Sequence, residues 1–207
     1  MSKIQKLINW AAPLVGLAAI AYSIHNRTGA NVGVVLVGRE QPEAIGFYAP
    51  HWRENYEPRF VDGVWDVTRI SDGDTIRVSR PGEDEIIIRF CGIDAPEDDQ
   101  PGGDAATQFV RDAVKRGNGK IGLNLIEQDR WGRWIGELYS EPGTFEESFL
   151  NADLIVAGHA WPYKQFWNNC PNLDVLKTSE KLAEEYGTAI WRKPGAVAPW
   201  DWRRQKR

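Results

Sequence analysis

Two acidic clusters and two arginines hold the residue types best suited to chemistry in this 207-residue chain. Carboxylates that short hydrophobic strands bring together can bind one hard cation, because Ca²⁺ prefers oxygen ligands. Arginines beside them would face an anion that the cation also binds, and a guanidinium group offers a planar fork to two phosphate oxygens. This pairing is the chemistry of phosphate esters. The clusters are 71–75 (Ser-Asp-Gly-Asp-Thr) and 89–97, which ends in Asp-Ala-Pro-Glu, and the arginines are Arg89, at the start of the second cluster, and Arg133.

Alternating or Ile-rich runs separated by turn signals surround these clusters. Asp72-Gly73 and Pro81-Gly82 are typical of turns between strands. We expect helices at 104–115, where Asp104 would be the N-cap, at 144–158, where residues 144–147 have the form of a capping box, and at 174–186, which Gly187 would end. Strands are expected at 64–70, 75–78, 85–93, 119–127 and 134–139.

The order of these elements predicts an α+β fold. Five strands with a helix before the fourth indicate a Greek-key barrel of the OB type, accompanied by three helices. Such barrels bind oligonucleotides on one face. We divide the chain into an N-terminal hydrophobic segment (1–25), a linker or irregular extension (26–61), the barrel domain (62–193) and a C-terminal tail (194–207).

From about residue 63 to 191 the chain resembles the staphylococcal (thermonuclease-type) nuclease family. The resemblance rests on Asp-Gly-Asp-Thr at 72–75, on the segment 89–97 and on Trp-Gly-Arg at 131–133, in that order. It extends to 151–158 and to Ile190-Trp191. The tail after Trp191 has no counterpart that we can assign.

The resemblance implies a calcium site. Asp74 and Asp94 would bind the ion through their carboxylates, and Ala95 would add its backbone carbonyl. Asp72 is expected beside these ligands rather than among them. Taken singly, an Asp-Gly-Asp stretch is most often just a turn.

The resemblance also implies three catalytic residues. Glu97 would position or deprotonate the attacking water, while Arg89 and Arg133 would hold the scissile phosphate and offset charge in the transition state. Replacing any of the three by Ala is expected to remove most activity and to leave the fold intact.

Aromatic residues give a secondary signal. Trp131, Tyr163 and Phe166 fall near the positions where the family contacts the nucleotide, and base stacking contributes roughly 1–3 kcal/mol with little sequence preference. Ordinary packing is an equal alternative for Trp131. His159 is expected at a helix end rather than in catalysis.

The implied activity is calcium-dependent hydrolysis of DNA and RNA, preferably single-stranded, with little sequence specificity and 3′-phosphate products. One alternative is a non-catalytic OB-fold module that binds single strands. Another is a tethered interaction protein that acts through its N-terminal segment and Trp-rich tail. We expect a monomer with no protein partner.

The net charge of −4 excludes binding to nucleic acid by bulk positive charge alone. The basic run 203–207 is interpreted as a short solvated tail.

Lys3 and Lys6 precede an uncharged stretch at 7–24, which indicates either a membrane anchor or a cleavable export signal. A protein exported in this way could pair its two cysteines, Cys91 and Cys170, but a buried thiol and an unrelated loop thiol explain them equally well.

Overall fold

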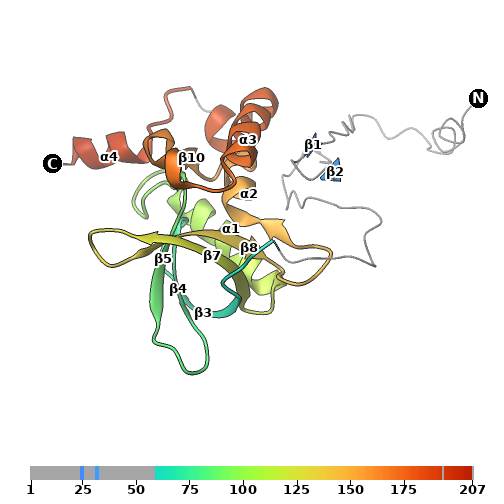
Figure 1. Ribbon diagram of the computed structural model, residues 1–207. Helices are drawn as coiled ribbons and strands as arrows, with labels where there is room; N and C mark the ends of the chain where they lie inside the picture. Colours follow the sequence, from blue (N-terminus) through green and yellow to red (C-terminus); the bar gives the residue numbers. More distant parts are fainter. Residues whose placement is uncertain (1–23, 26–30, 33–58, 193, 207) are drawn as a thin grey trace, which may run out of the picture.

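A closed barrel of five strands forms the centre of the computed structural model, which describes residues 24–25, 31–32, 59–192 and 194–206 (Figure 1). Neighbouring strands pair in the order β5-β4-β3-β7-β8, and a parallel pairing of β5 with β8 closes the barrel. Fully buried Ile76, Ile88 and Leu138 fill its interior. The predicted OB-type α+β fold is therefore confirmed. The strands are β3 (Val64–Ile70), β4 (Thr75–Ser79), β5 (Ile86–Phe90), β7 (Lys120–Gln128) and β8 (Trp134–Ser140).

Helices pack against this barrel, and Figure 1 shows α2 and α3 together above it. The three helices expected from the sequence are present, and a fourth, α4, forms in the tail. Short strands β1 (Ile24–His25) and β2 (Asn31–Val32) pair with each other, as do β6 (Ile93–Asp94) and β10 (Trp161–Pro162). The remaining elements are α1 (Gly103–Arg116), β9 (Ser148–Phe149), α2 (Leu150–Val156), the 3₁₀ helices η2 (Lys164–Asn169) and η3 (Ala189–Arg192), α3 (Leu173–Tyr186) and α4 (Pro199–Gln205).

Two predicted helix starts were wrong. Residues 144–147 form turns rather than a capping box, because the Glu147 carboxylate accepts hydrogen bonds from the N–H groups of Arg59 and Gly143 instead of closing a helix. The helix begins only at Leu150, after β9. Asp104 lies inside the first turn of α1, and Gly102 is the N-cap, with a left-handed φ of 105°.

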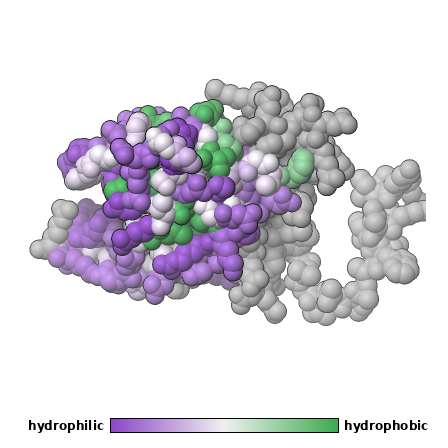
Figure 2. All heavy atoms as spheres, turned by 90° about the horizontal axis from the view of Figure 1, so that it is seen from below, coloured by the Kyte–Doolittle hydropathy of each residue, from purple (hydrophilic) through white to green (hydrophobic). Residues whose placement is uncertain are grey.

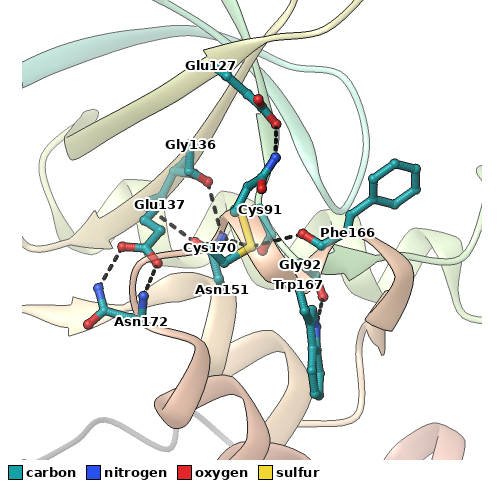
Figure 3. Close-up of a disulfide and its surroundings, with 12 residues drawn as sticks. Cys91, Gly92, Glu127, Gly136, Glu137, Asn151, Phe166, Trp167, Cys170 and Asn172 are labelled. Carbon is teal, nitrogen blue, oxygen red and sulfur yellow. Dashed lines mark hydrogen bonds between the residues drawn. A yellow bond between two sulfur atoms is a disulfide. The ribbon is translucent and has the colours of Figure 1, made fainter.

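A disulfide joins the barrel to the helical layer. Cys91 follows β5 and Cys170 follows η2, and their Cα atoms are 5.9 Å apart (Figure 3). Asn151 in α2 reinforces the same junction: its side-chain amide donates to the Cys91 carbonyl (3.0 Å), and its oxygen accepts from Leu138 N–H (3.0 Å). These contacts anchor the chain immediately before β6, which contains Asp94.

We expect reduction of the disulfide to lower the free energy of unfolding by about 4 kcal/mol, because the bond closes a long loop in the unfolded chain. The loop spans 79 positions of sequence. Denaturant unfolding with and without reductant measures the loss. Cys91→Ala/Cys170→Ala is the control and should lose similar stability without responding to reductant; an unchanged midpoint in reduced parent protein would contradict the expectation.

Asp153 in α2 makes stability depend on pH. Burial raises the pKa of this carboxyl to about 7, although its hydrogen bond from the Ser148 hydroxyl opposes the shift. The folded state therefore binds the proton more tightly than the unfolded state, where the pKa is near 3.8. The resulting stabilisation is complete below about pH 4 and is lost as the pH rises towards 7.

We therefore expect Asp153→Asn to gain stability relative to the parent protein as the pH rises from 4 to 8, by roughly 2–4 kcal/mol. Chemical denaturation of both proteins at several pH values gives the difference, in which the titration of all other groups cancels. A constant difference across this range would show that Asp153 is ionised in the folded protein at all of these pH values.

The sequence-based division into an N-terminal segment and an extension stays a prediction, because most of residues 1–58 lie outside the described residues. Within the part of the chain that the structure describes, no helix is long and apolar enough to cross a membrane. Residues 32–37 also have the composition of a short strand, and of these only Val32 is described, in β2. The end of the extension contacts the barrel: Val61 N–H donates to Asn124 Oδ1 (2.6 Å).

Candidate active site

Arg89 joins the two carboxylates that the sequence singles out as cation ligands. Asp74 closes the turn between β3 and β4, and the antiparallel register places its neighbour Thr75 opposite Arg89 in β5. The Arg89 guanidinium forms an ion pair with Asp74 Oδ1 and a second with Asp94 Oδ1, at 2.5 Å. Asp94 is 1% exposed, so this pair is almost fully removed from water. The barrel and the short strand β6 thus bring together residues from β5, the β3–β4 turn and β6.

The tight Asp-Gly-Asp turn holds Asp74 against α1. A Cβ atom at Gly73 would lie 2.6 Å from Ala106 Cβ and 2.8 Å from Ala95 Cβ, so only glycine allows this approach. Inside the turn, Asp74 N–H donates to Asp72 Oδ1 (2.9 Å). Burial raises the pKa of the Asp72 carboxyl, whereas the charge of Arg89 opposes that shift. Asp72 therefore shapes the turn beside Asp74, and its carboxyl also contributes to the electrostatic field around Arg89.

Glu97 faces the same carboxylates through an arginine that the sequence did not indicate. Arg203 of α4 lies between Glu97 and Asp94: its Nη2 is 2.7 Å from Asp94 Oδ2, and its Nη1 bonds Glu97 Oε1. Burial disfavours the charge of Arg203, but hydrogen bonds to Asp94 and Glu97 raise its pKa above the ordinary value. The interpretation of residues 203–207 as a solvated tail was therefore wrong for Arg203.

Arg133 takes part in the site through its charge rather than through a direct contact with the acids. Asp129, at the start of the same turn, accepts from Arg133 Nε (2.8 Å) and from the N–H of Trp131 (2.9 Å). Although partial burial acts in the opposite direction, the bonds from Arg133 lower the pKa of Asp129. Burial is the main cause of the lowered pKa of Arg89, and the charge of Arg133 adds to it; the same charge weakly opposes the rise that burial causes in the pKa of Asp72. Asp129 thus holds a cationic group near the acidic cluster.

The three aromatic candidates lie in two places. Trp131 is 66% exposed at the β7–β8 turn, with the guanidinium groups of Arg130 and Arg133 over its ring at 4.1 and 5.3 Å. Tyr163 and Phe166 contact each other edge to face, with ring centroids 4.7 Å apart. A residue that the sequence analysis did not select, Trp200 of α4, stacks on Tyr163 with centroids 5.1 Å apart and planes at 5°.

Arg203 and Trp200 were missed because the tail carries no motif. Pro199 at the first helical position was the one local signal of a helix there, and Trp200 and Arg203, three residues apart, would share one face of it. His159, by contrast, agrees with its prediction: it follows α2, packs on the Phe109 ring at 5.0 Å, and burial lowers its pKa.

The donor set suits a hard cation by its chemistry. Asp74 and Asp94 supply carboxylate oxygens, and the adjacent Ala95 has a backbone carbonyl. Among the described residues, no three acidic, His or Cys side chains already form a cluster that could hold a metal ion. Ala95 at present contributes its N–H, which donates to Asp74 Oδ2 (2.5 Å). The carboxylate oxygens are of the kind that a hard cation prefers, but the guanidinium groups of Arg89 and Arg203 neutralise them in this structure.

Comparison with known proteins identifies the family. The family model described as "Staphylococcal nuclease homologue" matches residues 87–193. The chain belongs to this family of nucleases. It is 33% identical to the "Micrococcal nuclease" of Shigella flexneri over 71% of this chain and 84% of that protein. It is 28% identical to an "Uncharacterized endonuclease" of Haemophilus influenzae over 68% of this chain and 73% of that one, and 31% identical to the "Probable staphylococcal-like nuclease CAN1" of Oryza sativa subsp. japonica, over 58% and 33% respectively.

The matched region contains most of the site just described. Arg89, Asp94, Glu97 and Arg133 lie within residues 87–193, whereas Asp74 precedes them on the barrel. Trp200 and Arg203 lie beyond the matched residues.

Proposed function

We propose that this protein is a calcium-dependent phosphodiesterase that cleaves DNA and RNA, preferably single-stranded, with little sequence preference, leaving 3′-phosphate ends. The observation that carries the proposal is the convergence of Asp74 and Asp94 on Arg89, with Glu97 next to Asp94 through a shared partner. Two buried carboxylates beside a buried guanidinium provide sites for a cation and for the anion that it would bind.

Asp74, Asp94 and the Ala95 carbonyl would hold the calcium ion. When bound, the ion would supply positive charge next to the phosphate and reduce its repulsion of an incoming hydroxide. Glu97, which is partly exposed, can reach a water at the surface of the site and accept its proton. Arg89 and Arg133 offset the negative charge that grows on the phosphate oxygens.

In this proposal exposed Trp131 stacks on a base, and the two guanidinium groups over its ring would bind the adjacent phosphates. Stacking of this kind does not distinguish among bases, which agrees with low sequence preference. Most of the coloured residues in Figure 2 are hydrophilic, with hydrophobic ones between them at the surface only in places. Binding would therefore depend on local groups rather than on a broad apolar surface.

The disulfide and the hydrophobic segment at 7–24 together support a location outside the reducing cytosol, by export or by membrane anchoring through that segment. We propose a monomer, with nucleic acid as the substrate.

Incubation of the full chain with single-stranded DNA, duplex DNA and RNA, with added Ca²⁺ or with chelator, tests the proposal. We expect cleavage of all three with Ca²⁺, fastest on single strands, and none with chelator. Labelled 5′ and 3′ ends would identify the position of the phosphate. Binding of single strands without any Ca²⁺-dependent cleavage would contradict the proposal and favour a binding module.

A further inference from the structure

The tail helix α4 occupies the position that the cation and the substrate would need. Arg203 contacts both carboxylate oxygens of Asp94, Oδ1 at 3.2 Å and Oδ2 at 2.7 Å, and it also bonds Glu97. A bidentate guanidinium is a strong partner for a carboxylate. No oxygen of the Asp94 carboxylate is left without a positively charged donor.

The second expected ligand, Asp74, is similarly engaged. Its Oδ1 pairs with Arg89, and its Oδ2 accepts from Ala95 N–H. Arg89 belongs to the barrel and is 13% exposed, so it is a fixed part of the site. Arg203 is different, because it comes from a short terminal helix and is 37% exposed. It is the partner of Asp94 that can leave without opening the barrel.

Aromatic stacking holds α4 in this place. The Trp200 ring lies flat on Tyr163, one of the two candidate base-stacking residues there, and contacts the Trp161 ring edge to face at 6.4 Å. A nucleotide base could not use that face of Tyr163 while Trp200 covers it.

Polar contacts tie the same helix to the loop after Glu97. Trp202 Nε1 donates to Asp99 Oδ1 (3.0 Å), and Lys206 forms an ion pair with the same carboxylate. Just before α4, the Val197 carbonyl accepts from Gln100 Nε2 (2.7 Å). The helix is therefore docked at several points. In this position Arg203 reaches Asp94 and Glu97, and Trp200 reaches Tyr163.

We propose that α4 is a built-in cap of the active site, in which Arg203 competes with the cation for Asp94 and Glu97 while Trp200 covers Tyr163. The proposal rests on the function proposed above. The cap opens when a divalent cation replaces Arg203 on Asp94, so cation binding and release of Arg203 are one exchange. The affinity of the parent protein for Ca²⁺ is lowered by the work of displacing Arg203.

A calorimetric titration of the metal-stripped full chain with Ca²⁺ alone tests the proposed cap without measuring activity. Arg203→Ala should bind Ca²⁺ about ten-fold more tightly than the parent, because the charge-assisted bonds from Arg203 to Asp94 and Glu97 no longer need to break. Arg204→Ala is the matched control: it removes the same charge from the same helix, but Arg204 pairs with Asp201, and its affinity should equal that of the parent.

Trp200→Ala distinguishes the effect of α4 docking from the effect of the Arg203 charge. This substitution removes no charge and touches no expected ligand, yet it loosens α4 and should tighten Ca²⁺ binding by a smaller factor. Thermal unfolding confirms that each variant is folded. The cap is overturned if Arg203→Ala binds Ca²⁺ with an affinity equal to or weaker than that of the parent. It is also overturned if the Ca²⁺ affinity of Trp200→Ala equals that of the parent, or if no variant binds Ca²⁺.

Cleavage assays on the same proteins separate this proposal from the previous one. If Arg203→Ala binds Ca²⁺ more tightly but no variant cleaves nucleic acid, the cap stands and the proposed nuclease activity fails. If cleavage depends on Ca²⁺ but Arg203→Ala binds it no better than the parent, the activity stands and the cap fails.

Discussion

Arg89→Ala is expected to impair both catalysis and stability. The variant leaves Asp74 and Asp94 buried without their shared cation, and breaking a buried ion pair by removing one partner costs about 3–5 kcal/mol. The cleavage rate should also fall by at least about 10²-fold, because a preorganised charge next to the phosphate is lost. The sequence alone suggested that this substitution would leave the fold intact, whereas the burial of the pair predicts a marked loss of stability.

Urea unfolding in the presence of chelator measures the stability loss of Arg89→Ala. Arg77→Ala is the matched control: it removes an arginine from the neighbouring strand β4 whose pair with Glu85 is largely exposed, so a loss below about 1 kcal/mol is expected. Ca²⁺ should restore more stability to Arg89→Ala than to the parent, because it can neutralise Asp74, which loses its ion pair, and Asp94, which keeps only its pair with Arg203. Equal stability of Arg89→Ala and the parent in chelator would mean that these carboxylates are hydrated or protonated.

Glu97→Gln should lower the single-turnover cleavage rate at saturating Ca²⁺ by about 10²–10³-fold, since the amide keeps the shape of the side chain but cannot accept a proton. Glu97 is only partly buried, and its partner Arg203 can still bond Asp94, so the melting temperature should hardly change. A rate loss with intact folding would support Glu97 as the base rather than as a structural residue.

Asp98→Asn is the matched control for Glu97→Gln. Asp98 is the next residue along the same loop and is exposed, so its substitution removes one negative charge near the site without removing the base. We expect a rate close to that of the parent. Similar losses in both variants would attribute the effect to the net charge of the loop, and an undiminished rate in Glu97→Gln would rule out the assigned chemistry.

Much of the barrel could be predicted because the residues that specify its strands and turns are close together in the sequence. Ile-rich strands, Asp-Gly and Pro-Gly turns and the Gly187 stop of α3 each depend on neighbours within a few residues, and their strand order follows from short connections. The helix start at 144–147 failed for the opposite reason. Glu147 is bonded by Arg59, a residue 88 positions earlier, and a local capping pattern contains no trace of that partner.

The sequence by itself determined that Asp74, Arg89, Asp94 and Glu97 follow one another with a spacing similar to that of the staphylococcal nuclease family, because residue types and short turns can be recognised from neighbouring residues. Only the tertiary structure decided that Arg203 reaches two of these acids from more than a hundred residues away. A basic run at the end of a chain looks the same whether it is solvated or docked. The difference lies in the packing of Trp200 on Tyr163, a contact between distant segments that no local pattern specifies.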